Sequence, residues 1–102
     1  MANINLAWTN PTETDIDNIC VHRFDTDQSA TYADDTLISA TDAAAFAASA
    51  TTVLNLSDGS YTYSSGAASF TDTVSAGTYT YGVFSKNQTG YGPGEAQTIT
   101  VA

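Results

Sequence analysis

Residues 69–85 have the sequence SFTDTVSAGTYTYGVFS, which predicts two β-strands joined by a tight turn. Both halves are rich in β-branched and aromatic residues, which favour strands, and Ser75-Ala76-Gly77 between them favours a turn. Side chains alternate between the two faces of a strand, so Tyr79, Tyr81 and Val83 share one face. We expect the strand after the turn to be a strong one.

The same pattern recurs along the rest of the chain. Apolar and polar residues alternate from residue 3 to residue 9, and Asn10-Pro11 ends this strand because proline cannot continue a ladder. Further strands are predicted at residues 19–24 and 96–101 and, from weaker signals, at 36–39 and 53–56. About seven short strands without a βαβ rhythm predict an all-β fold, an antiparallel sandwich of two sheets.

One segment breaks the strand pattern. Residues 42–48 are rich in alanine, which has the best helix propensity, and Asp42 is a residue type that caps helix N-termini. We therefore predict a short helical insert near 42–48, with Phe46 inserted into the core. Packing must hold such a helix, because one or two turns alone are unstable in water.

Length and charge restrict the classes of partner. The 102 residues fit one domain, spanning 1–102. Eleven acidic residues against two basic ones give a net charge of -9, which repels phosphate backbones and anionic lipids and so excludes nucleic acid and membrane surfaces as partners. The first eight residues lack a positive segment and a long apolar stretch, so we expect no signal peptide there.

The chain carries few groups with catalytic or metal-binding chemistry. Cys20 is the only cysteine, so neither a disulfide nor a cysteine-based zinc or iron–sulfur site can form within one chain. His22, the only histidine, lies two residues away, but the pair lacks an oriented third group. With no nucleotide-binding or nucleophile-elbow motif either, we predict a protein that is not an enzyme and that needs no cofactor.

Two acidic pairs could attract a hard cation such as calcium. Asp15 and Asp17 precede the strand at 19–24, and Asp25 and Asp27 follow it, so about 20 Å separates the pairs at about 3.3 Å per residue. Neither pair has the spacing of a calcium loop, and we predict ordinary solvated turns with no metal site.

Both ends of the chain resemble the fibronectin type III family. Trp8, Pro11, Ile19 and Val21 are similar to its opening pattern, and residues 77–83 with the following Asn–Gly loop resemble its closing pattern. The match covers about half of the chain. It departs from the family at Val74 and Ala76, with one residue fewer before the turn, and in the alanine-rich insert.

The resemblance implies a fibronectin type III or immunoglobulin-like sandwich in which two aromatic residues have core roles. It places Trp8 at the centre of the sandwich, and it places Tyr79 where a corner tyrosine bonds a backbone group across the turn. Both would then be core residues and not site residues.

The candidate binding residues lie in loops at one end of the predicted sandwich. Asn87, Thr89 and an exposed Tyr91 belong to a glycine-rich loop at 86–95, and Asp15 and Asp17 belong to the loop at 12–18. The alternative is a plain turn in which Tyr91 packs down on Pro93.

These observations favour a structural or binding module. By analogy with sandwich domains on phage particles, we expect a bacteriophage virion protein, a capsid decoration or tail accessory protein assembled in the host cytoplasm. Its partner would be a capsid or tail protein, with a homo-oligomer on the particle left open. The alternative is an extracellular accessory module, a carbohydrate binder or spacer of a secreted enzyme or adhesin, which a row of exposed aromatic residues would favour.

Overall fold

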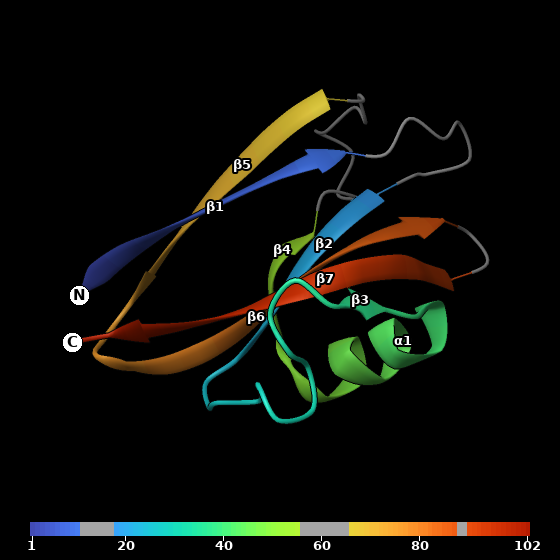
Figure 1. The fold of residues 1–102 in the computed structure, drawn as a ribbon. Coiled ribbons are helices and arrows are strands. Elements are labelled where there is room, and N and C mark those ends of the chain that lie inside the picture. Colours follow the sequence, from blue (N-terminus) through green and yellow to red (C-terminus); the bar gives the residue numbers. More distant parts are fainter. Residues whose placement is uncertain (11–17, 56–65, 88–89) are drawn as a thin grey trace.

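The computed structural model describes residues 1–10, 18–55, 66–87 and 90–102. This part of the chain forms seven strands and one short helix, which confirms the predicted all-β class (Figure 1). In chain order the elements are β1 (Ala2–Asn10), β2 (Asn18–Phe24), β3 (Leu37–Ile38), α1 (Ala40–Ser49), β4 (Thr51–Asn55), β5 (Gly66–Val74), β6 (Gly77–Asn87) and β7 (Gly90–Val101).

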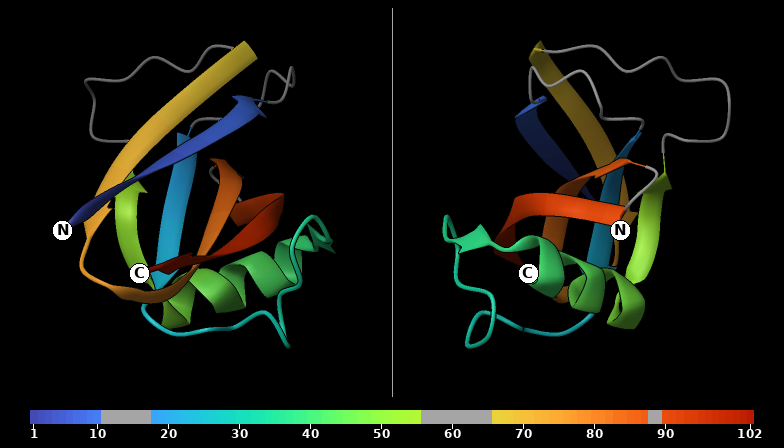
Figure 2. Two further views of the ribbon diagram at one scale, coloured as in Figure 1. Left: turned by 60° about the vertical axis from the view of Figure 1, so that its left-hand side comes forward. Right: turned by 90° about the vertical axis from the view of Figure 1, so that its right-hand side faces the viewer.

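The strands form two antiparallel sheets, as predicted. One sheet has two strands in the order β1-β5, and the other has five in the order β3-β7-β6-β2-β4. β1 and β5 pair along nine residues, from Ala2 opposite Val74 to Asn10 opposite Gly66. β6 is the central strand of the larger sheet, between β7 and β2, and the two-stranded sheet faces this larger sheet (Figures 1 and 2).

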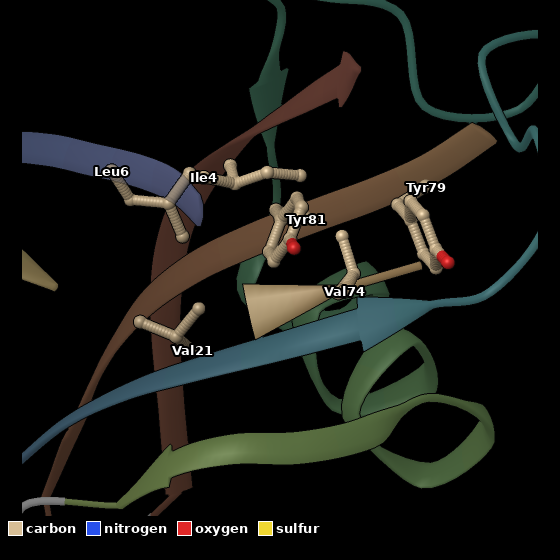
Figure 3. Close-up of a cluster of buried hydrophobic side chains, with 6 residues drawn as sticks. All are labelled: Ile4, Leu6, Val21, Val74, Tyr79 and Tyr81. Carbon is tan, nitrogen blue, oxygen red and sulfur yellow. The ribbon is translucent and has the colours of Figure 1, made fainter. Parts of the chain in front are cut away.

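The core between the two sheets is built from alternating positions of the facing strands. Its six buried side chains are Ile4, Leu6, Val21, Val74, Tyr79 and Tyr81 (Figure 3). The Tyr79 hydroxyl donates to the backbone oxygen of Ser75, 2.8 Å away across the turn between β5 and β6, as predicted for a corner tyrosine. The buried Tyr79 side chain thus connects the turn with the core.

Trp8 does not lie at the centre of this core, contrary to our expectation. Its side chain is only partly buried and packs against the edge of the cluster, whereas Tyr81 is 1% exposed. The reason is its position near the C-terminal end of β1, an edge strand of a sheet with only two described strands.

The helical insert forms a third layer on the opposite face of the larger sheet (Figure 2). Phe46 is fully buried there, as predicted. Its ring contacts Phe24, Tyr32 and Phe84 edge-on, at centroid distances of 4.7, 4.8 and 5.3 Å. Gly82 lies beneath it: a Cβ at Gly82 would stand 2.9 Å from Phe46 Cε1, so glycine gives the helix room to approach.

The helix begins earlier than predicted, and a different residue caps it. Ser39 is the N-cap, and its hydroxyl accepts from the backbone N–H of Asp42 at 3.2 Å. Asp42 therefore lies in the first turn, where its negative charge interacts favourably with the positive end of the helix dipole. Among the described residues, no helix is long and apolar enough to cross a membrane.

The predicted glycine-rich loop at 86–95 is largely a β-hairpin. β6 continues to Asn87 and β7 already begins at Gly90, opposite it. The register shifts between Phe84, which pairs with Gly94, and Lys86, which pairs with Tyr91. One strand therefore has one residue more than its partner in this interval, which is a β-bulge.

Candidate functional site

Tyr91, the central residue of the predicted binding loop, is half-buried rather than exposed. Its hydroxyl lies 3.2 Å from Nε2 of His22, and the two rings meet edge-on at 5.6 Å between centroids. The Lys86 ammonium lies 4.9 Å from the centre of the Tyr91 ring. The bulge explains this placement, because it puts Tyr91 on the same face of the sheet as Lys86 and Gly94, the face that α1 also covers.

His22 is the buried partner of Tyr91. The residue is 2% exposed, and its Nδ1 lies 3.0 Å from the Thr52 hydroxyl on β4. Burial, and secondarily the Lys86 charge, lower the pKa of His22 below its ordinary value. Burial also raises the pKa of Cys20, which lies beside Tyr91 on the same face. The thiol and the imidazole are therefore both uncharged near neutral pH.

This arrangement is suited to a structural role. A nucleophilic cysteine needs a lowered pKa or an adjacent base, and Cys20 has a raised one. Both ring nitrogens of His22 lie within hydrogen-bond distance of a hydroxyl group, on Thr52 and on Tyr91. The buried imidazole therefore has hydrogen-bond partners inside an apolar layer. Within the described ranges, no three His, Cys, Asp or Glu side chains come together as they would around a metal ion.

The other predicted site residues are only partly placed. The backbone of Asn87 ends β6, while Thr89, Asp15 and Asp17 lie outside the described residues. β2 begins at Asn18, which pairs with Lys86, so the chain enters β2 beside the hairpin end.

The second acidic pair lies at the other end of β2. Asp25 accepts from Arg23 Nε at 2.6 Å, and Asp27 accepts from the backbone and hydroxyl of Ser29 at 2.9 and 2.6 Å. These hydrogen bonds lower the pKa of Asp27. Both carboxylates thus make the local contacts typical of polar turns.

An ion pair between the sheets was not predicted from the sequence. Arg23 Nη1 lies 2.7 Å from Asp72 Oδ2 on β5, and the Tyr81 hydroxyl donates to the same oxygen at 2.8 Å. The two side chains of the ion pair are 17% and 13% exposed. Burial, together with this hydrogen bond to Asp72, raises the pKa of Tyr81. Three strands are therefore joined at one carboxylate.

One accessible feature of the described structure is a groove beside β1, which we did not predict from the sequence. It has a volume of about 650 Å³ and lies between β1 and the inner face of β6 and β7. Residues 5–9 form one wall, Val83 and Ile99 lie on the floor, and Leu37 lies at the β3 side. In the described residues, two strands cover only part of the five-stranded sheet, and the groove lies beside them.

The groove combines exposed apolar surface with negative charge. Leu37 is 70% exposed, one of two large apolar side chains so exposed in the described residues. Asp35 and Glu95 line the groove, and its lining contains no Lys or Arg. Arg23 and Lys86, the chain's two basic side chains, face Asp72 and Tyr91 elsewhere. This groove is the candidate interaction site.

The comparisons with known proteins found no relative of this chain. No protein-family model matches the chain, and neither the curated proteins nor the solved structures contain a significant match.

Proposed function

We propose that this protein is a non-enzymatic structural module that attaches to a larger protein assembly through the β1 groove. The observation that carries the proposal is the groove itself: an apolar floor and an exposed Leu37 beside a strand edge. Exposed apolar surface next to an open sheet edge is typical of protein–protein contacts. The described His22, Cys20 and Arg23 side chains, by contrast, serve internal contacts.

We further propose that the sandwich is of the fibronectin type III or immunoglobulin-like kind. The order β7-β6-β2 supports this, since a sandwich of that kind keeps its last two strands beside one early strand in a single sheet. The hydrogen bond from Tyr79 to Ser75 supports it as well. The insert carrying β3 and α1 is additional to such a sandwich.

The assembly that we propose is a bacteriophage particle, to which the protein would add as a capsid decoration or tail accessory protein. We make this assignment by analogy with the sandwich modules of phage particles. The net charge of -9 agrees with a protein partner that presents positive charge, and disfavours packaged nucleic acid. The end of the β6–β7 hairpin would then be displayed outward.

The alternative, a carbohydrate-binding or spacer module outside the cell, has less support. Sugar-binding faces of sandwiches present aromatic rings to solvent, but Met1 and Leu37 are the exposed large apolar residues of the described chain. The aromatic side chains described here are at least partly buried.

Co-sedimentation tests this function. The purified protein is mixed with capsids and tails of the phage that encodes it, and separately with insoluble polysaccharides. The bound fraction is measured after centrifugation. We expect saturable binding to particles and none to polysaccharide. Binding to polysaccharide alone would contradict the assignment and favour the alternative.

A further inference from the structure

We propose that the β1 groove takes an extended segment of a partner protein, which pairs with β1 as an added strand and alternates apolar with basic side chains. This inference rests on the proposed function for the idea of attachment. It goes further in naming the backbone that the partner pairs with and the chemistry of the partner's side chains.

The first argument is the edge of β1. β1 pairs with β5 along its whole length, and in the described residues no strand pairs with its other side. In an antiparallel ladder, alternate residues direct N–H and C=O toward the partner, and those between direct theirs away. Along residues 5–7, β1 thus presents alternate backbone groups at the groove, and an extended peptide can pair with such an edge.

The second argument is the floor of the groove. A strand beside β1 would lie about 4.8 Å from it and would pass over Val83 and Ile99. Both side chains are partly buried and already pack against the sandwich core. Every second residue of the added strand would point toward them, so apolar residues at those positions would extend the core. Leu37 would be covered as well.

The third argument is charge. Asp35 and Glu95 line the groove without a basic neighbour in its lining, and the whole chain carries a net charge of -9. A basic segment would be attracted over the distance of a Debye length and would pair with these carboxylates. A second copy of this chain, also at -9, would be repelled, and so the occupant is a different, basic protein.

Peptide titration tests the proposal without any phage particle. The probe is a capped peptide of alternating valine and lysine, nine residues long, added to isotope-labelled protein at low salt. We expect saturable shifts in the amide NMR signals of residues 5–9 and Leu37, with a change in Trp8 fluorescence. Three control peptides are used: the same composition without alternation, glutamate in place of lysine, and the alternating sequence with every second peptide nitrogen methylated.

The expected pattern among the peptides is specific. Methylation removes backbone N–H donors needed for pairing and keeps every side chain, so that peptide should bind at least about tenfold more weakly, and the acidic peptide should not bind. Equal binding by the alternating and non-alternating peptides would show plain charge attraction and would overturn the proposal. So would shifts centred on β4 or β5, or absence of binding by all peptides.

Variants of the protein supply a matched control. Glu95→Gln in the groove and Asp42→Asn on α1 each remove one negative charge from an exposed side chain. We expect Glu95→Gln to raise the dissociation constant about threefold and Asp42→Asn to leave it nearly unchanged, because a local ion pair is lost only in the first. Equal effects of the two variants would contradict pairing at the groove.

The two proposals fail in different ways. If particles bind the protein but neither the peptides nor Glu95→Gln has the expected effect, strand addition is wrong and the structural function stands. If the alternating peptide binds at β1 and no particle does, the virion assignment is wrong and the strand site stands. A concentration-dependent dimer with the same amide shifts would identify a second copy as the occupant and would overturn the basic partner.

Discussion

At the scale of single residues, one carboxylate joins the two sheets. Asp72 on β5 accepts from both Arg23 on β2 and Tyr81 on β6, whereas Asp25 accepts from the same guanidinium at an exposed position. A protein loses stability when a buried polar group loses its partner, whereas exposed ion pairs contribute little to stability. The two carboxylates that accept from Arg23 should therefore contribute unequally to the free energy of unfolding.

We predict that Asp72→Ala lowers the free energy of unfolding by about 2–3 kcal/mol, because Arg23 and Tyr81 would lose their shared acceptor inside the sandwich. Asp25→Ala, the control, should lower it by less than about 1 kcal/mol. Urea unfolding followed by Trp8 fluorescence measures both. Equal losses would mean that the inter-sheet pair is no more important than a surface one.

His22 should make stability depend on pH. Burial lowers the pKa of His22 from its ordinary value of 6.5, so the unfolded chain binds a proton before the folded chain does. Stability should thus be lost as pH falls below about 6.5, before most carboxylates titrate. Urea unfolding between about pH 7.5 and 5.5 measures this loss. His22→Gln should flatten the profile, and parallel profiles for the two proteins would refute the assignment.

At the scale of elements, the helical insert is an integral layer and not an appendage. Phe46 is fully buried among three other rings, and Ala43 beside it is also fully buried. The exposed side of α1 carries Ala44 and Ala45, which have no core contact in the described structure. The stability of the insert therefore depends on one face.

We predict that Phe46→Ala lowers the free energy of unfolding by about 3–5 kcal/mol, since it leaves a cavity between α1 and the sheet. Ala44→Gly, the control on the exposed face, should lower it by about 1 kcal/mol through helix propensity alone. Thermal and urea unfolding measure the difference. If Phe46→Ala were as mild as the control, the third layer would not be packed as described.

The sequence predicts elements better than it predicts their environment. Alternation located β1, β2 and β5–β7, and the alanine run located α1 with Phe46 inward. The cap was assigned to Asp42 instead of Ser39 because both residue types favour N-caps. The edges β3 and β4 were weak signals, as expected for short strands whose neighbours are distant in sequence.

The candidate site was hardest to predict because it depends on pairing between distant segments. The glycines at 90–94 favoured a loop, but the hairpin register with β6 extends nearly to its tip. A bulge then turns Tyr91 toward His22, and no local pattern indicates a bulge at that position. The groove lies where the described strands of the smaller sheet leave part of the larger one uncovered, which is a property of topology.

At the scale of the whole molecule, a strongly acidic surface encloses three layers. The net charge is -9 over 102 residues, so the folded state carries self-repulsion that salt screens. We predict that the melting temperature rises between about 10 and 150 mM salt, as the Debye length falls from about 30 to 8 Å. Sodium chloride and choline chloride should act equally. A rise with sodium alone would point to a specific cation site and contradict simple screening.

Amide hydrogen exchange of the free monomer, read residue by residue by NMR, tests the open edge of β1 most directly. We predict alternating protection along residues 3–7, with slow exchange where the N–H faces β5 and fast exchange where it faces the groove, while β6 is protected from Thr80 to Phe84, where it pairs with β2 and β7. Uniform protection along β1 in the monomer would mean that its edge is already covered, and would contradict the account.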